Sequence, residues 1–243
     1  MKNFLRINIF LAGLLIAFSC SNSPATSSGS SSSTSSSSTG GGVVTNELFG
    51  IFSDTVSNSD GLTWSTNSGV SDYWLNSWAA SDGATVYELI SGSSPAGDGN
   101  NYLKLYIKEG AYGGGITFAL SNTTLGYDMS RFTNGYLVFS IAVPSYSADP
   151  IIAIERQEYS GPNHRGSQIL LTNGAYGFQK DGNIHTVVIP ISHFIQATAD
   201  EGLHGRMQAS DFTNIGTFFQ LRGQSTGGGN LTNVVLDNIY WYR

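Results

Sequence analysis

A glycoside hydrolase needs two carboxylates on either side of one glycosidic bond, and the sequence offers one tempting pair. Glu155 and Glu158 lie close together in a run that reads as a β-strand. Residues i and i+3 of a strand point to opposite faces, so these two carboxylates do not flank one bond. The four histidines show no i,i+2 or i,i+4 pairing of the kind that places two imidazoles on one metal ion. We therefore expect no enzymatic activity.

Sugar binding requires flat aromatic faces for the C–H side of a pyranose and planar polar groups for its hydroxyls. A polar, loop-like segment carries four large rings, namely Trp64, Tyr73, Trp74 and Trp78. Exposed rings of this size are costly, so they either fill the core or line a binding surface. Trp74 and Trp78 are the candidates for stacking on a sugar, with inward packing from one helical face as the alternative. Tyr112, in a glycine-rich loop, is a further candidate at the rim.

Two strand-like runs add polar side chains that share faces. Alternation places Glu155 and Gln157 on one face of the first run, and it places Phe218, Gln220 and Arg222 on one face of the second. The planar guanidinium of an arginine is a rigid fork of donors that suits neighbouring hydroxyls. We expect the four polar residues to line a sugar-binding sheet. The alternative is that they form the solvated outer face that every β-sandwich has.

These candidates need a framework that brings distant strands together. Alternating or β-branched runs recur through the chain and are separated by turns rich in Gly, Asn, Asp and Pro. They predict strands over residues 85–90, 102–107, 115–120, 135–143, 151–157, 168–172, 185–191, 217–222 and 234–242. Short helical pieces are expected over 192–195 and 210–214. Many strands with glycine-rich connections in one domain, 43–243, predict an all-β fold that is a two-sheet antiparallel β-sandwich.

The composition excludes several other classes of protein. Only 12% of the 243 residues are charged, which argues against a helical bundle. A single Cys excludes a disulfide framework, and one Cys with four scattered His excludes a zinc cluster. The formal net charge of −6 argues against nucleic-acid binding and against electrostatic attraction to anionic lipid.

The N-terminal residues are expected to lie outside the folded domain. Residues 1–19 combine Lys2 and Arg6 with a short apolar run and end directly before Cys20, which resembles a bacterial lipoprotein signal. The resemblance implies removal of the signal and lipidation of Cys20, with an ordinary secretory signal as the alternative. Residues 20–42 are nearly all Ser, Thr and Gly, which is typical of a disordered tether. We therefore expect a protein of the bacterial cell envelope, at the outer membrane or cell surface, that contacts the membrane through its lipid alone.

A set of short motifs follows one another along residues 46–243. They are Leu48–Asp54, Pro95–Leu105, Gly113–Phe118, Asp128–Phe132, His185–Phe194 and Val234–Trp241. In this order they resemble the galactose-binding-like β-jelly rolls used as carbohydrate-binding modules, particularly those attached to bacterial β-glucanases. The resemblance implies a jelly-roll sandwich that binds a neutral, glucan-like polysaccharide or oligosaccharide without catalysis. We expect a monomer with no nucleic-acid partner.

The same resemblance implies a structural Ca²⁺ that holds the first strand to the last. Carried over by motif, its ligands are Asp54, Asp98 and Asp237, whose carboxylate oxygens are ligands that Ca²⁺ prefers. A turn-forming role for Asp98 and a backbone hydrogen bond for Asp237 are the alternatives. Two other functions stay open: a surface adhesin or structural lipoprotein that binds proteins, and a polysaccharide hydrolase or lyase. The residue types that resemble an alginate-lyase jelly roll are Arg156, Gln168, Tyr176 and His185.

Overall fold

The computed structural model describes residues 47–67, 69–78, 85–97, 99, 101–109, 114–121, 125–158, 163–199, 205–224 and 227–243. These residues all belong to one compact unit of the chain. Some of the predictions concern residues outside these ranges. The expected signal over 1–19, the expected tether over 20–42 with Cys20, and the candidates Asp98 and Tyr112 lie outside the described residues.

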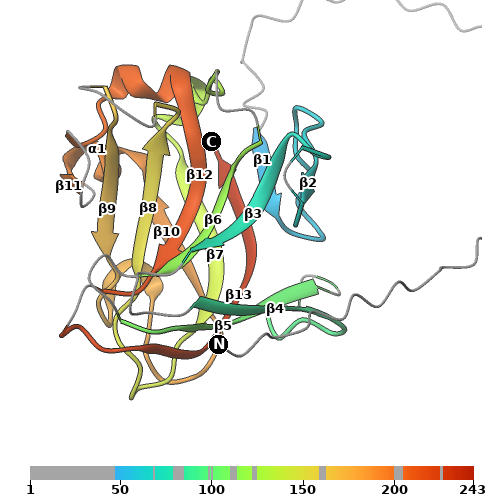
Figure 1. Ribbon diagram of the computed structural model, residues 1–243, viewed down its shortest axis with the longest axis vertical. Coiled ribbons are helices and arrows are strands. Elements are labelled where there is room, and N and C mark those ends of the chain that lie inside the picture. Colours follow the sequence, from blue (N-terminus) through green and yellow to red (C-terminus); the bar gives the residue numbers. More distant parts are fainter. Residues whose placement is uncertain are drawn as a thin grey trace, which may run out of the picture. The chain divides into compact units, whose positions relative to one another are not determined.

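Two β-sheets form the fold (Figure 1). The six-stranded sheet has the order β10-β7-β13-β5-β4, and β1 pairs with the C-terminal half of β13. The seven-stranded sheet has the order β11-β9-β8-β12-β6-β3-β2. The strands are β1 (Leu48–Phe52), β2 (Trp64–Ser65), β3 (Tyr73–Trp78), β4 (Thr85–Ser91), β5 (Asn101–Ile107), β6 (Gly115–Leu120), β7 (Tyr136–Ala142), β8 (Ile151–Arg156), β9 (Gly166–Leu170), β10 (His185–Pro190), β11 (Thr198–Ala199), β12 (Ile215–Arg222) and β13 (Leu231–Tyr242).

The chain passes between the two sheets many times, which is the connectivity of a jelly roll. Within the described residues the paired strands run antiparallel, apart from the parallel pair β2 and β3. The predicted two-sheet antiparallel β-sandwich is therefore confirmed. The short helices are η1 (Ser130–Phe132), η2 (Ala175–Gly177), α1 (Ile191–Gln196) and η3 (Ala209–Asn214). None of the helices in the described part of the chain is long and apolar enough to cross a membrane.

Apolar side chains from the inner faces of both sheets fill the space between them. Phe219 of β12 lies edge-on to Phe139 of β7, with 5.2 Å between the ring centroids, and both rings are fully buried. The indole Nε1 of Trp241 on β13 donates a 3.0 Å hydrogen bond to the carbonyl oxygen of Phe218 on β12. Trp64 packs against Phe52, so this ring contributes to the core as the core alternative predicted. The inward-facing side chains of the alternating strands thus form a continuous core.

A β-bulge interrupts the alternation in β12. The register with β6 shifts between Thr217 and Phe219, and both Phe218 and Phe219 are fully buried. The extra residue in a bulge lets two consecutive side chains point to the same side of a sheet. The prediction that Phe218 shares a face with Gln220 and Arg222 is therefore wrong. The prediction that Gln220 and Arg222 share a face holds, because they lie beyond the bulge.

The segment that the sequence presents as loop-like contains β3, which lies between β6 and the short edge strand β2. Residues Tyr73–Trp78 pair with β6 along their whole length, from Tyr73 opposite Leu120 to Trp78 opposite Gly115. The helical alternative for Trp74 and Trp78 is therefore wrong. Because alternate residues of a strand share a face, two residues four apart still point to the same side. Tyr73 and Leu75 are buried in the core, so Trp74 and Trp78 lie on the outer face.

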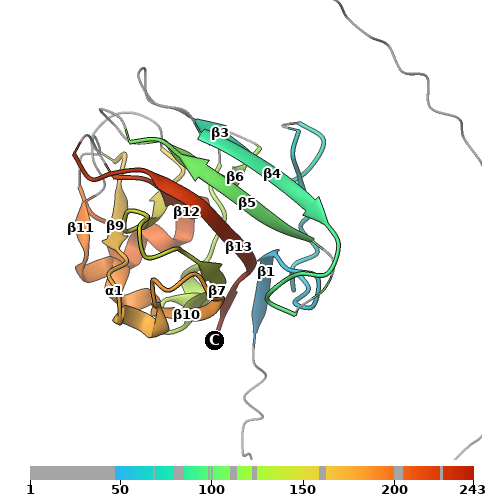
Figure 2. The same ribbon diagram turned by 90° about the horizontal axis from the view of Figure 1, so that it is seen from below.

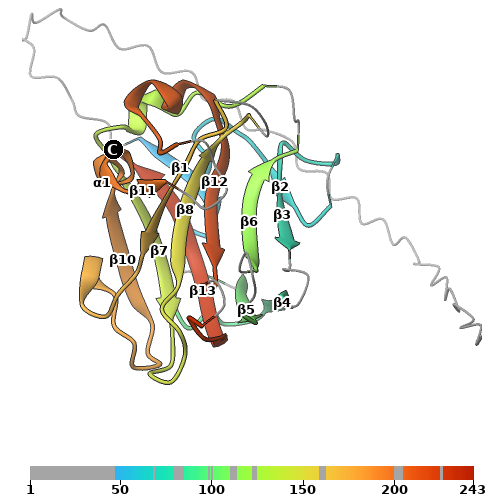
Figure 3. The same cartoon turned by 60° about the vertical axis from the view of Figure 1, so that its left-hand side comes forward.

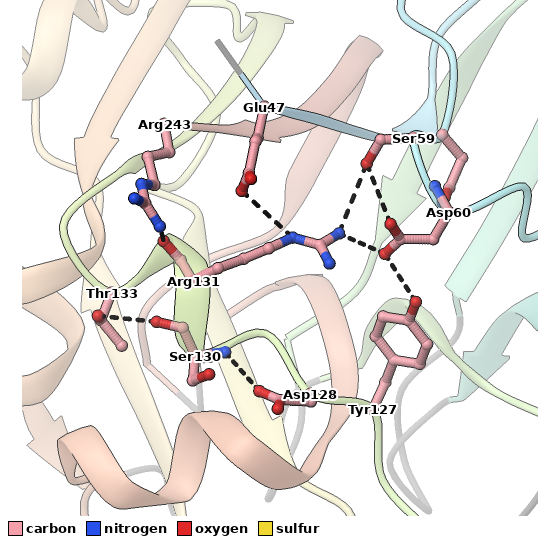
Figure 4. A network of polar contacts seen from close by, with 10 residues as sticks. Glu47, Ser59, Asp60, Tyr127, Asp128, Ser130, Arg131, Thr133 and Arg243 are labelled. Carbon is pink, nitrogen blue, oxygen red and sulfur yellow. Dashed lines mark hydrogen bonds and ion pairs between the residues drawn. The ribbon is translucent and has the colours of Figure 1, made fainter. Parts of the chain in front are cut away.

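The first and last strands lie side by side, as expected (Figure 2). Leu48 pairs with Tyr242, and a polar network around Arg131 reinforces this junction (Figure 4). Arg131 forms an ion pair with Asp60 and a second one with Glu47, at 3.5 Å. Tyr127 donates a 2.6 Å hydrogen bond to Asp60. The network links the N-terminal strand region to the η1 turn.

This network predicts an acid-sensitive contribution to stability. Burial by itself raises the pKa of Asp60, but hydrogen bonds from Tyr127 and Arg131 outweigh it and bring the pKa below its ordinary value of 3.8. A carboxylate whose pKa is lowered by folding stabilises the fold above the unfolded-state pKa, and this contribution is lost as the pH falls through the folded-state pKa. Urea unfolding of wild type and Asp60→Asn should therefore differ at pH 6, and the difference should shrink below about pH 4. A difference that stays constant down to pH 2 would contradict this assignment.

Candidate functional site

The outer face of the seven-stranded sheet carries an array of polar and aromatic side chains. They alternate along β3, β6, β12, β8 and β9 with residues that point into the core, so they share the side of the sheet that faces away from the core. We call this set the polar face. Its members are Trp74, Asn76, Trp78, Thr117, Glu155, Gln168, Thr217, Gln220 and Arg222.

The two tryptophans sit beside very small neighbours. Trp74 lies opposite Ala119, and Trp78 lies opposite Gly115. A Cβ atom added at Gly115 would come within 2.5 Å of Trp78 Cη2 and 2.8 Å of Arg222 Cβ. The indole of Trp78 therefore extends across the glycine toward Arg222 and is half-buried. Such an indole offers a flat ring on which the apolar side of a sugar can stack.

The centre of the polar face is a hydrogen-bonded layer. Gln220 Nε2 donates a 3.0 Å hydrogen bond to Glu155 Oε1, and the Thr217 hydroxyl lies 3.5 Å from Glu155 Oε2. Arg222 donates to Gln168 Oε1. Because Glu155 only accepts, it fixes the orientation of the Gln220 amide, whose Oε1 is buried and accepts no hydrogen bond from the described residues. Buried polar atoms left without a partner are rare in native structures.

The formal charges of the polar face cancel. Within the set, Glu155 carries the negative charge and Arg222 the positive one. Glu155 and Gln168 are half-buried, whereas Gln220 and Arg222 are only 7% and 6% exposed. An array of donors and acceptors with no net charge, set around two aromatic rings, suits an uncharged, hydroxyl-rich ligand.

The structure separates Glu158 from this array and buries Gln157. Gln157 is 3% exposed and its side chain lies over Gly216. A Cβ atom added at Gly216 would come within 2.2 Å of Gln157 Oε1. Glu158 forms an ion pair with Arg156 at 2.7 Å, and Arg156 also pairs with the buried Asp211 at 2.8 Å. Glu158 therefore belongs to a structural ion-pair network at the end of β8 and does not join Glu155.

The residues that resemble a lyase set are distributed over the fold. Gln168 lies on β9 of the seven-stranded sheet, whereas His185 begins β10 of the six-stranded sheet. The Nε2 atom of His185 lies 2.9 Å from a carboxylate oxygen of Asp181. The pKa of Asp181 is lowered to about 2, most strongly by a hydrogen bond from the backbone amide of Asn183 and next by one from His185. Tyr176 contacts His193 instead, with its hydroxyl 3.1 Å from Nδ1. His185 and Tyr176 therefore bond to different partners, and His185 and Gln168 lie on different sheets.

Each of the two described calcium candidates accepts a hydrogen bond from a residue near the junction of β4 and β5, Asp237 from Ser94 and Asp54 from Asn101. Asn101 donates to both carboxylate oxygens of Asp54 through its backbone amide at 2.9 Å and its side chain. Ser94 donates to Asp237, which is 1% exposed and also accepts a 2.7 Å bond from the Asn238 amide. Among the described residues no three His, Cys, Asp or Glu side chains converge on one point. The donor chemistry of Asp54 and Asp237 fits a hard cation that draws further oxygens from this junction.

Asn76, Thr117 and Thr217 were not identified from the sequence as members of the site, and Gln168 was named only in the lyase set. Asn76 lies on β3, which was expected to be a loop, so its face could not be assigned. Thr117 lies between the core residues Ile116 and Phe118 in a predicted strand. Strand alternation alone would have placed it on the outer face.

The fold and the polar face define a jelly-roll sandwich with a candidate carbohydrate-binding sheet. No family model matches the sequence, and no curated protein matches it. Among solved structures, a family 30 carbohydrate-binding module of a Clostridium thermocellum cellulosomal cellulase is similar, with 15% identity, 80% of this chain and 96% of the module covered, and a TM-score of 0.47. A family 11 module from Clostridium thermocellum in complex with a β-1,3-1,4-mixed-linked tetrasaccharide has 15% identity, 73% and 92% coverage, and a TM-score of 0.46. Another family 30 module has 14% identity, 82% and 88% coverage, and a TM-score of 0.49.

Proposed function

We propose that this protein binds a neutral, glucan-like polysaccharide or oligosaccharide on the polar face, without catalysis. The observation that carries the proposal is the array itself, in which two tryptophans adjoin a charge-balanced layer of amide, hydroxyl, carboxylate and guanidinium groups. The apolar faces of the sugar rings stack on Trp74 and Trp78. The hydroxyl groups of the sugar exchange hydrogen bonds with the half-buried side chains of Asn76, Glu155 and Gln168.

The buried members of the array act by holding the exposed ones in place. Arg222 fixes Gln168, and Gln220 fixes Glu155. Side chains held before the ligand arrives lose little conformational entropy on binding, which raises affinity. A preformed sheet surface therefore binds a sugar chain more tightly than mobile side chains of the same types.

Affinity electrophoresis tests the proposal. Residues 43–243 are run in native gels with and without soluble β-1,3-1,4-mixed-linked glucan, the linkage of the tetrasaccharide bound to the similar family 11 module. The polysaccharide should retard the protein, and a reference protein without a glycan site should migrate equally in both gels. Unchanged migration with this and other neutral glycans, together with binding to a protein, would favour an adhesin. The release of new reducing ends or unsaturated sugars would show an enzyme.

The proposal includes the place of the protein in the cell. A lipid on Cys20 and the Ser/Thr/Gly-rich residues 21–42 would hold the sandwich at the bacterial cell envelope. A flexible chain of this length has a root-mean-square reach of about 25 Å. The domain could then meet long polysaccharides while the acidic protein surface contributes no attraction to the lipid.

Calcium is proposed as a clamp between the first and last strands, with Asp54 and Asp237 as ligands together with Asp98. Calcium at about 100 times its Kd should raise the melting temperature by about 5 °C or more, because binding to the folded state alone stabilises it. Chelation should remove the increase, and Asp54→Asn should melt at the same temperature with or without calcium. Asp72→Asn is the control, since Asp72 bonds to Thr63 elsewhere in the fold. If chelation leaves the melting temperature of the wild type unchanged, the proposed calcium clamp is excluded.

A further inference from the structure

A pocket of about 330 Å³ opens beside the polar face, at the edge formed by β9 and β11. Its lining includes Gln168, Leu170, Tyr176, His193, Gln196 and Thr198. Among the described residues, β11 pairs with β9 at Ser167 and Gln168, and α1 and β11 lie together at this edge of the sandwich (Figure 1, Figure 3). Gln168 belongs both to the polar face and to the pocket. The two surfaces are therefore continuous.

Tyr176 adopts an unusual backbone conformation in this pocket. Its φ is 54° and its ψ is 24°, in the left-handed region, and the neighbouring Gly174 and Gly177 also have positive φ. A bulky residue in this region costs about 1 kcal/mol, and such strain collects at ligand sites. The Tyr176 hydroxyl lies 3.1 Å from His193 Nδ1, and the two rings meet edge-on with centroids 5.6 Å apart. The imidazole thus holds the phenol ring at the pocket wall.

The lining chemistry indicates an uncharged ligand. The pocket walls contain amides, a hydroxyl, a phenol and an imidazole, and none of the lining residues is Asp, Glu, Lys or Arg. The volume lies at the lower end of the range for small-molecule sites and is sufficient for about one or two sugar units. An aromatic ring beside amide donors and acceptors is the same combination that the polar face offers.

The spacing between strands gives the length of glycan chain that would reach the pocket. β3 and β9 are separated by four inter-strand steps, which is about 19 Å at the usual spacing of about 4.8 Å. One sugar unit of an extended chain spans about one such step, so about four units cross from Trp78 to Gln168. Additional units at the end of the chain extend beyond Gln168 into the pocket.

We propose that this pocket is a terminal subsite that takes the end of a neutral glycan chain lying across the polar face. The inference rests on the proposed function and adds a requirement for chain length. Short chains occupy the polar face alone, whereas chains of about six units also contact Tyr176. The subsite therefore sets a preference for long chains over short ones.

Calorimetric titration with a tetrasaccharide and a hexasaccharide of β-1,3-1,4-glucan tests this inference. Wild type should bind the hexasaccharide about tenfold more tightly than the tetrasaccharide. Tyr176→Asn removes the ring and keeps a residue that tolerates the left-handed conformation. This variant should lose the tenfold preference and bind the tetrasaccharide as wild type does. Tyr146→Asn is the control, because Tyr146 is 71% exposed and bonds to Asn233 of the six-stranded sheet.

The outcomes separate the two proposals. If wild type binds neither oligosaccharide, the proposed function itself is wrong. If wild type binds both with equal affinity, or if Tyr176→Asn keeps the tenfold preference, the subsite alone is overturned. An equal loss of affinity for both lengths, with a lowered melting temperature, would assign Tyr176 a purely structural role and also overturn the subsite.

Discussion

Replacement of Trp78 by alanine is expected to abolish retardation by mixed-linked glucan in affinity electrophoresis. The indole extends across Gly115 and adjoins Arg222, so its removal takes away the stacking surface at the C-terminal end of β3. Truncation of an aromatic anchor in a binding surface typically costs about 2 kcal/mol or more, which is a loss of affinity of about 30-fold. Titration with the tetrasaccharide should give the same factor.

Two controls separate loss of binding from loss of folding. Trp78 is half-buried at the end of β3, and the variant should keep the far-ultraviolet spectrum of a β-sandwich. Tyr146→Ala removes an exposed ring away from the polar face and should leave retardation unchanged. Retardation of Trp78→Ala equal to that of wild type would show that the glycan binds elsewhere.

Replacement of Arg222 by alanine is expected to weaken glycan binding by about tenfold to 100-fold. Arg222 lies between Gly115 of β6 and Ile151 of β8, donates to Gln168 and adjoins the Trp78 indole. Hydrogen bonds that involve a charged group are worth about 1.5–3 kcal/mol, and the fork of an arginine is not reproduced by lysine. Arg222→Lys should therefore recover only part of the affinity.

Because Arg222 is buried, a second variant keeps this prediction testable. Gln168 is half-buried and is the hydrogen-bond acceptor of Arg222, so Gln168→Ala should fold normally and lose several-fold in affinity. Melting curves recorded beside each titration identify any loss that comes from unfolding. Wild-type affinity in folded Arg222→Ala and Gln168→Ala would exclude both side chains from the site.

The strand pattern was sufficient to predict much of this architecture. Alternation placed Glu155 on one face of β8 and placed Gln220 and Arg222 together on one face of β12, and the structure brings these strands together as neighbours. The bulge at Phe218 was not predictable, because a single extra residue leaves no mark in the apolar pattern. Pairing of β8 with β12 joins residues about 65 positions apart, a distance that local propensity cannot bridge.

Strand β3 shows a different limit of prediction from sequence. Its sequence contains Asn76 and Ser77, and the apolar alternation of Tyr73 and Leu75 is short and flanked by polar residues. Pairing with β6 makes this segment a strand, so tertiary contacts override a weak local preference. The left-handed conformation of Tyr176 was equally unpredictable from the sequence, since neighbouring glycines permit a left-handed residue without requiring one.

The indole N–H signals of the four tryptophans test the central claim most directly. In a two-dimensional NMR titration with the β-1,3-1,4-glucan tetrasaccharide, the signals of Trp74 and Trp78 should shift with ligand concentration. Those of Trp64, which packs on Phe52, and Trp241, which donates to Phe218 in the core, should stay in place. Unmoved signals from Trp74 and Trp78 in the presence of bound tetrasaccharide would contradict sugar binding on the polar face.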